Sequence, residues 1–281
     1  MIKQLLKLSQ EIRDYFNVLF RWMKNKRNPV FKHKENSLFI FMYGSLGSGK
    51  STIAASLCYA IELNPDTRLL YNFNEPDGIT FLRKNWINNL KEHSFPERSN
   101  IFEISEVDIG IESKESASLP ITFIELSGEK FHSIDPTKGN SAFTGKIDSN
   151  IYKYIAKSKV HFIIADTTKN EKDNTSISIY IQYLEAILSD KKIEDYKFCL
   201  ILSKWDKVEH LGLTAREYVR KYLPSIYTLI MLNSTISISR VFTFSIGKVE
   251  QKDNSRTERI SNFNYNDAKK ILKWLWMNHD V

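Results

Sequence analysis

Short apolar runs alternate along the chain with stretches in which apolar residues recur every three or four positions. The runs predict buried β-strands, and the spaced stretches predict amphipathic helices. The expected strands are residues 38–43, 101–111, 121–126, 159–165, 198–202 and 241–244. The expected helices are residues 52–62, 81–93, 174–189 and 267–277, with another that begins at the capping box Thr214–Glu217 and is interrupted at Pro224. This alternation favours an α/β fold in which helices cover both faces of a mainly parallel sheet.

The first strand and the first helix are joined by the most informative octapeptide of the chain. Residues 44–51 read G-S-L-G-S-G-K-S and satisfy the phosphate-loop pattern G-x-x-x-x-G-K-[S/T]. The glycines let backbone N–H groups surround a phosphate at a helix N-terminus, Lys50 would reach the β- and γ-phosphates, and Ser51 would bind Mg²⁺. The predicted nucleotide-binding residues of this loop are Gly44, Ser45, Leu46, Gly47, Ser48, Gly49, Lys50, Ser51 and Thr52. A chance match in a glycine-rich turn is the alternative, and the flanking strand and helix argue against it.

A carboxylate follows the phosphate loop at the end of a later strand. Strand 121–126 carries Glu125, and Gly128 follows with two residues between them. By itself, this pattern also fits a strand that ends in an ordinary turn.

Two more strands end in polar segments. Strand 198–202 runs into S-K-W-D at residues 203–206, and strand 241–244 runs into Ser245, Ile246 and Gly247. The Asp206 carboxylate could accept hydrogen bonds from both N1–H and the exocyclic amine of guanine, a pair of donors that adenine lacks. A charged loop after a strand is the alternative interpretation.

In this order the four segments resemble the motifs of Ras-like and translation-factor-related P-loop GTPases. Gly-Glu at residues 128–129, Leu-Ser-Lys-Trp-Asp at 202–206 and a tryptophan-containing helix before the F-P-E-R-S turn at 95–99 are more narrowly similar to the bacterial double-GTPase (DO-GTPase) proteins of conflict-system operons. The resemblance spans residues 37–278. It implies a three-layer P-loop GTPase fold with one antiparallel edge strand, formed where 101–111 pairs with 121–126, and binding of GTP or GDP with Mg²⁺.

The resemblance also implies roles in sensing the γ-phosphate. Glu125 stands where these GTPases carry an Asp that holds a Mg²⁺-bound water, and its side chain is one methylene longer. The N–H of Gly128 would contact the γ-phosphate, and Ser99 would close onto Mg²⁺ from the first switch. Three other hydroxyls are rival candidates for that switch: Thr80, Ser94 and Ser105.

The remaining roles concern the base and the hydrolysis step. Glu129 stands where many Ras-like enzymes carry a water-orienting Gln, and this exchange predicts slow hydrolysis or hydrolysis that waits for a partner. The implied base-binding residues are Ser203, Lys204, Asp206, Ser245 and Ile246. The catalytic candidates are Lys50, Ser99 and Glu129, and the metal-binding candidates are Ser51, Ser99 and Glu125.

Residues 1–36 form a separate segment ahead of the GTPase-like body at 37–281. Apolar residues recur at spacings of three and four from Leu5 to Trp22, which predicts an amphipathic helix. The segment holds nine Lys or Arg and three acidic residues, so its net +6 makes up nearly all of the chain's +7. Docking on the domain itself or on a partner protein is the first interpretation, peripheral contact with an anionic membrane is the second, and no motif supports nucleic-acid binding.

The remaining composition predicts a cytoplasmic protein, with a membrane-peripheral location as the alternative. Cys58 and Cys199 lie in apolar stretches and are expected to be reduced core residues. No apolar run approaches the ~18–20 residues that cross a bilayer, and the charged N-terminus lacks a signal peptide's apolar block.

Three functions remain open at this point. The first is a Mg²⁺-dependent GTP-hydrolysing switch whose loops a partner protein reads. The second is a GTP-binding scaffold with negligible turnover, and the third is a P-loop ATPase or nucleotide kinase. The third function gives residues 203–206 no role.

Overall fold

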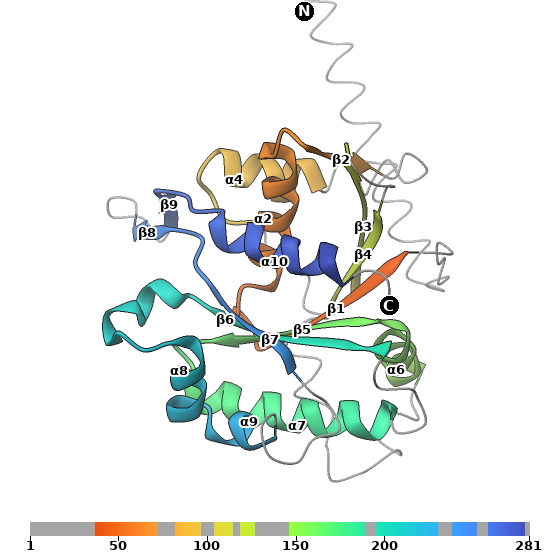
Figure 1. Cartoon of the computed structure of the whole chain (residues 1–281), viewed down its shortest axis with the longest axis vertical. Helices are drawn as coiled ribbons and strands as arrows, with labels where there is room; N and C mark the ends of the chain where they lie inside the picture. Colours follow the sequence, from red (N-terminus) through yellow and green to blue (C-terminus); the bar gives the residue numbers. More distant parts are fainter. Residues whose placement is uncertain are drawn as a thin grey trace, which may run out of the picture. The chain divides into compact units, whose positions relative to one another are not determined.

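A seven-stranded sheet forms the centre of the fold (Figure 1). Its strands are β1 (Leu38–Gly44), β2 (Thr67–Tyr71), β3 (Ile104–Ser113), β4 (Leu119–Leu126), β5 (Val160–Asp166), β6 (Lys197–Ser203) and β7 (Ile238–Phe244). The computed structural model describes residues 37–71, 82–96, 104–114, 119–126, 146–188, 195–229, 238–251 and 258–278. The chain divides into two units, Met1–Ser37 and Leu38–Val281, and the helix expected at 1–36 lies outside the described residues.

The strands follow the order β2-β3-β4-β1-β5-β6-β7 across the sheet. β1 is parallel to its neighbours β4 and β5, and the parallel pairing continues through β6 to β7. β3 runs antiparallel to β4, as expected for residues 101–111 and 121–126. The expected α/β fold with a mainly parallel sheet is confirmed. The sequence analysis missed β2, which pairs with β3 in antiparallel fashion and moves the edge of the sheet one strand outward.

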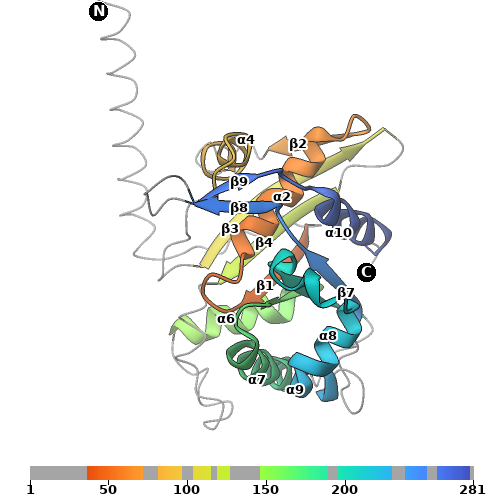
Figure 2. The same cartoon turned by 90° about the vertical axis from the view of Figure 1, so that its left-hand side faces the viewer.

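Helices cover both faces of the sheet (Figures 1 and 2). One layer contains α2 (Lys50–Leu63), η1 (Leu82–Asn88), α4 (Asn89–Lys91) and α10 (Asn266–Met277). The other contains α6 (Lys146–Lys157), α7 (Asn170–Leu188), α8 (Ala215–Tyr222) and α9 (Pro224–Thr228). Two short helical turns, η4 (Trp205–Lys207) and η5 (Glu209–Leu211), follow β6. The three layers are those of the P-loop GTPase fold.

A small hairpin, which the sequence analysis did not anticipate, packs on the α2 layer. Its strands are β8 (Lys248–Gln251) and β9 (Glu258–Ser261). The Ile260 side chain is buried in the same core as α2 and α10, and its N–H donates to the carbonyl of His93 at 2.8 Å.

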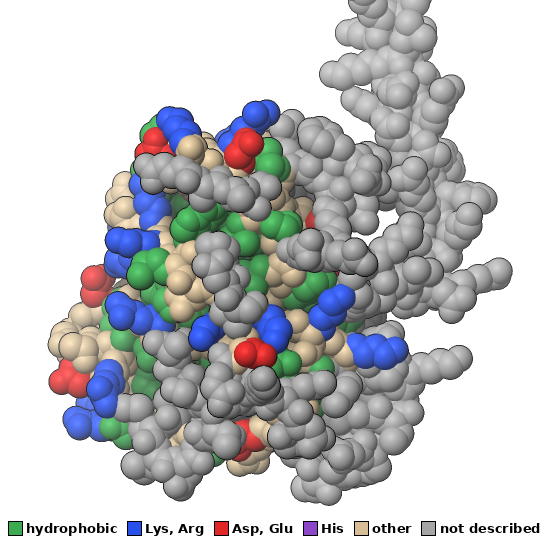
Figure 3. All heavy atoms as spheres, turned by 45° about the vertical axis from the view of Figure 1, so that its right-hand side comes forward, with side chains coloured by type: hydrophobic (Ala, Val, Ile, Leu, Met, Phe, Trp, Pro, Cys, Tyr) green, Lys and Arg blue, Asp and Glu red, His purple; other side chains and the backbone are tan. Residues whose placement is uncertain are grey.

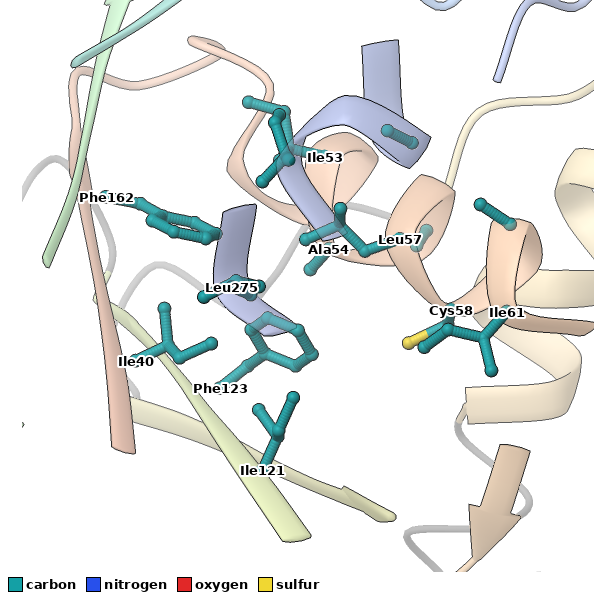
Figure 4. Packing of buried hydrophobic residues seen from close by; sticks show 14 of the residues in the cluster. Ile40, Ile53, Ala54, Leu57, Cys58, Ile61, Ile121, Phe123, Phe162 and Leu275 are labelled. Carbon is teal, nitrogen blue, oxygen red and sulfur yellow. The ribbon is translucent and has the colours of Figure 1, made fainter. Parts of the chain in front are cut away.

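The core between the sheet and α2 fixes the start of that helix above the end of β1. β1 is buried along its whole length because strands flank it on both sides and helices cover it. Figure 4 shows Ile53 and Leu57 of α2 packed together with Phe123 of β4 and Leu275 of α10. Each such side chain contributes about 1.5–3 kcal/mol when it is fully buried.

Several local expectations are confirmed. Cys58 and Cys199 are buried free thiols within this core. The side chain of Thr214 accepts a hydrogen bond from the Glu217 N–H in a capping box that opens α8, and Pro224 begins α9. None of the helices in the described ranges combines the length and apolar character needed to cross a membrane.

The opposite face of the sheet buries a histidine among aromatic rings. His161 of β5 lies 5.1 Å from the ring of Phe198 and 5.9 Å from that of Phe41, measured between ring centroids. Its Nδ1 is 3.1 Å from the hydroxyl of Tyr180. Burial disfavours the charged imidazolium and lowers the pKa of His161 from 6.5 to about 3. The ring is therefore neutral in the folded protein.

Replacing His161 by Phe should make the protein less sensitive to acid. The folded-state pKa lies below the unfolded value, so the unfolded chain takes up the proton first as the pH falls. The stabilisation is fully present above about pH 6.5 and is lost progressively toward about pH 3. Between about pH 7 and pH 5, the wild type should lose about 2 kcal/mol more of its free energy of unfolding than His161→Phe, measured by urea denaturation.

The exposed His210 of η5 provides a matched control. His210→Gln should lose as much stability as the wild type over the same interval. Equal losses in all three proteins would contradict the assignment of acid sensitivity to His161.

Candidate functional site

The phosphate loop begins where β1 passes against β5. A Cβ on Gly44 would lie 2.8 Å from the carbonyl oxygen of Ile164 and 2.5 Å from Ser48 Oγ, so no side chain fits at this position. Gly47 and Gly49 have φ angles of +74° and +90°, in the left-handed region that disfavours other residues. The loop glycines predicted from the sequence are therefore required by the backbone itself. The remaining predicted loop residues, Ser45, Leu46, Ser48, Ser51 and Thr52, lie between β1 and the first turn of α2.

Lys50 is buried at the start of α2 and turns back onto its own loop. Its ammonium donates to the carbonyl oxygens of Gly44 at 2.8 Å and Ser45 at 3.2 Å. Burial lowers the pKa of Lys50, while the nearby carboxylates of Glu125 and Asp173 act in the opposite direction. A phosphate would supply the negative charge that this partly desolvated cation favours.

Ser51 and Glu125 are brought together as predicted. The Ser51 hydroxyl lies 2.7 Å from Oε1 and 2.9 Å from Oε2 of Glu125, a buried carboxylate at the end of β4. The parallel pairing of Met42 with Glu125 places this carboxylate beside the root of the loop. One hydroxyl and one carboxylate are the hard oxygen ligands that Mg²⁺ uses when phosphates and waters complete its shell.

This site differs from a metal centre built from protein ligands alone. In the described parts of the chain, no group of three or more His, Cys, Asp or Glu side chains is placed to hold a metal. The Ser51–Glu125 pair therefore fits a metal that arrives with a phosphorylated ligand.

The S-K-W-D segment follows β6 at the same edge of the sheet as the phosphate loop. Ser203 is buried, and a Cβ on Gly49 would lie 4.0 Å from its Cβ, so the two segments adjoin. The Ser203 hydroxyl donates to the carbonyl of Ala165 at 3.2 Å. The serine therefore anchors its loop to β5.

Lys204 makes an ion pair at the base of this segment. Its ammonium lies 2.6 Å from Oδ2 of Asp166, the buried last residue of β5. Burial alone would raise the pKa of Asp166, but hydrogen bonds from Lys204 and Thr168 outweigh it and lower that pKa. Asp166 therefore stays ionised and holds the lysine at the end of β5.

The third and fourth predicted segments meet at Asp206. The Ser245 hydroxyl lies 3.3 Å from Oδ1 of Asp206, and the Ser245 N–H donates to Asp267 at 3.1 Å. Ile246 is buried beside them. Gly247 has a φ of +121°, and a Cβ there would lie 2.4 Å from the carbonyl oxygen of Asn262. The segment after β7 is thus joined to Asp206, the candidate for binding the base, by a direct contact.

Sequence reasoning missed the contribution of the segment after β5. The Lys169 ammonium donates to the carbonyl of Leu46 in the phosphate loop at 2.8 Å. Thr167 Oγ1 donates to the carbonyls of Ser203 and Lys204 at 3.0 and 2.9 Å. The only signal for these contacts was that 159–165 is a parallel strand whose end lies at the edge shared with the loops.

The predicted switch residues Ser99, Gly128 and Glu129 lie outside the described residues, as does the rival hydroxyl of Thr80. Ser94 is described and follows α4, where its N–H donates to the carbonyl of Asn89 at 2.7 Å.

The sheet and the loop after β1 define the fold of a P-loop nucleotide-binding protein. No protein-family model matches the chain, and no curated protein matches it. Among solved structures, the chain is similar to the structure of Methanosarcina barkeri Roco2 RocCORdC bound to GDP, with 14% identity and a TM-score of 0.39. The match covers 88% of this chain and 51% of that one, so the chain spans about half of that protein's length. The narrower DO-GTPase resemblance stays a prediction.

Gly247 and Gly212 should respond very differently to substitution by Ala. Gly247→Ala should destabilise the fold by about 3 kcal/mol or more, because it combines an unfavourable φ with a backbone clash. At Gly212, φ is +64° and no heavy atom lies within 4 Å of an added Cβ, so Gly212→Ala should cost only about 1 kcal/mol. Urea denaturation of both variants measures the difference, and equal costs would contradict the close approach at Gly247.

Proposed function

We propose that this protein is a Mg²⁺-dependent GTP-binding switch that hydrolyses GTP slowly or on contact with a partner. The contact between Ser245 and Asp206 carries the proposal. It joins the two proposed base-binding segments beside the glycine-rich loop, where the Lys50 ammonium lies 2.8 Å from the carbonyl oxygen of Gly44.

The candidate groups within the described residues lie at one edge of the sheet. Five parallel strands, β1, β4, β5, β6 and β7, end there, and ligands of open α/β sheets bind beyond such carboxyl ends. Phosphate would bind at the loop of Gly44–Ser51, where Lys50 places its charge. Asp206 would recognise guanine by accepting hydrogen bonds from its N1–H and its exocyclic amine. Ser245 would orient the Asp206 carboxylate.

The metal ion would be held by Ser51 and Glu125. When bound, Mg²⁺ supplies positive charge to the phosphate oxygens. Before that, the Ser51 hydroxyl donates to Glu125, so the carboxylate holds the hydroxyl oxygen in place. Lys50 binds the β- and γ-phosphates and neutralises part of the charge that develops on the leaving group.

The hydrolytic part of the proposal rests on the sequence alone. Glu129 would orient the attacking water less well than Gln because its charge repels the γ-phosphate, so turnover would be slow without a partner. Ser99 and Gly128 would sense the γ-phosphate. A partner protein would read these loops or the basic N-terminal segment, and peripheral membrane contact of a cytoplasmic protein is the alternative role of that segment.

Two other functions are distinguished by experiment. A GTP-binding scaffold would bind GTP with the same affinity and release no phosphate. A P-loop ATPase would leave the Asp206–Ser245 contact without a role, and would prefer ATP.

Lys50→Ala should weaken binding of a non-hydrolysable GTP analogue by about 2–4 kcal/mol, roughly 30- to 1,000-fold, because the phosphates lose a partly desolvated charge. Any phosphate release from GTP should disappear with it. Calorimetry and a phosphate-release assay measure both effects. Lys114→Ala, which removes an exposed lysine paired with Asp66, is the matched control and should change neither. Unchanged affinity in Lys50→Ala would refute the phosphate site.

Asp206→Asn should shift the preference of the protein from GTP toward xanthosine triphosphate. The new amide donates to the xanthine carbonyl that replaces the guanine amine, whereas the carboxylate only accepts. Competition binding with GTP, xanthosine triphosphate and ATP measures the change. Ser245→Ala is the companion variant, and it should weaken GTP binding without changing the preferred base. A wild-type protein that prefers ATP would end the guanine assignment.

A further inference from the structure

A hollow of about 450 Å³ lies along β7 and away from the candidate nucleotide site. Residues 240–243 of β7 form one wall. Lys270, Lys273, Trp274 and Met277 of α10 contribute another, and the first residue of α8 closes one side. None of the predicted nucleotide-binding residues lines this hollow, which is called the β7 groove below.

The β7 groove follows the edge of a strand. Successive side chains of a strand point to opposite faces of the sheet. A hollow that touches four consecutive residues must therefore run along the strand's edge. β7 is the last strand in the sheet order, and within the described ranges no strand pairs with its outer side. Such an edge can accept another strand through main-chain hydrogen bonds.

The side chains around the groove are basic and apolar. Arg240 and Lys273 are exposed, and no hydrogen bond or ion pair of either side chain occurs among the described residues. The Lys270 ammonium forms an ion pair with Asp267, with 2.9 Å between Nζ and Oδ1. The half-buried Trp274 packs edge-on against Phe242, with 6.0 Å between ring centroids.

The apolar wall of the groove is open to a partner. Met277 is 73% exposed although it is a large hydrophobic residue at the end of α10. Figure 3 shows hydrophobic side chains lying among Lys and Arg on the described part of one face, where acidic side chains are fewer. An occupant that matches the groove is therefore apolar in part and negatively charged.

We propose that the β7 groove binds an extended acidic segment of a partner protein, which adds to β7 as a further strand. An apolar side chain of that segment packs on Trp274 and Met277, and carboxylates on either side of it pair with Arg240 and Lys273. The inference goes beyond nucleotide binding and does not depend on it.

Charge argues against two occupants from the chain itself, the N-terminal segment and a second copy. Residues 1–36 carry a net +6, which is the wrong sign for a basic groove. A second copy paired through its own β7 would bring two sets of Arg240 and Lys273 into one interface, and like charges there are unfavourable.

The test uses a fluorescein-labelled heptapeptide, Thr-Glu-Thr-Leu-Thr-Glu-Thr, with blocked ends. In an extended chain its Leu and both Glu lie on one face, which suits the apolar wall and the two cations. Fluorescence anisotropy with the full-length protein should show saturable binding. The same peptide with Lys in place of Glu should bind at least tenfold more weakly. This comparison uses the unmodified protein, so it is independent of how any variant folds.

Variants then locate the binding. The double variant Arg240→Glu/Lys273→Glu should weaken binding at least tenfold. Arg68→Glu reverses an exposed charge on β2, at the opposite edge of the sheet, and should change the affinity less than twofold. Equal melting temperatures of the variants confirm that they are folded.

Two N-methylated peptides test main-chain pairing. One carries N-methyl groups on the odd-numbered backbone amides, and the other carries them on the even-numbered backbone amides. Only one edge of an added strand pairs with β7, so only one of the two should lose binding. Absence of saturable binding, equal binding of the Lys peptide, indifference to the double charge reversal, or equal behaviour of the two methylated peptides would overturn the proposal. A concentration-dependent dimer that the double reversal abolishes in sedimentation velocity would make a second copy the occupant, and would also overturn it.

Discussion

A lysine ammonium is buried at the end of the central strand, and much of the candidate site is arranged around it. An isolated cation removed from water would cost several kcal/mol. Here two loop carbonyls accept from Lys50, and Glu125 and Asp173 lie near enough to act on its charge. Both carbonyls belong to the first two residues of the loop, and Gly44 is required there because a Cβ would lie 2.8 Å from the carbonyl oxygen of Ile164 in β5. The close packing at Gly44, the shape of the loop and the position of the Lys50 ammonium therefore depend on one another.

The segment after β5 connects the two halves of the site. Lys169 holds the phosphate loop at Leu46, and Thr167 holds the loop that carries Asp206. The hydroxyl of Tyr218, from α8, donates to the carbonyl of Thr167 at 3.0 Å and fixes that segment from behind. The two candidate loops, 44–51 and 203–206, therefore share one support.

The sequence predicted those parts of the fold in which a single physical requirement dictates the local sequence. The loop at 44–51 is recognisable because phosphate binding demands its glycines and lysine at fixed spacing. The buried parallel strands are recognisable because both of their faces are apolar. β2 was missed because an edge strand with exposed Arg68 carries only half of that pattern, and β8 and β9 are too short to show a period. The Lys169–Leu46 contact joins residues 123 apart in the chain, and no local pattern encodes such a pair.

The alkylation rates of the two buried cysteines report on local opening of the core. Burial raises the pKa of both Cys58 and Cys199, and a thiol reacts with alkylating reagents only as the exposed thiolate. Cys58 lies in the helix behind the phosphate loop, and Cys199 lies in the strand that leads to the base-reading loop. The alkylation rate of each sulfur consequently depends on how often that half of the molecule opens. A ligand that bridges the two halves must slow both alkylation reactions together, so the native cysteines report on binding without an engineered label.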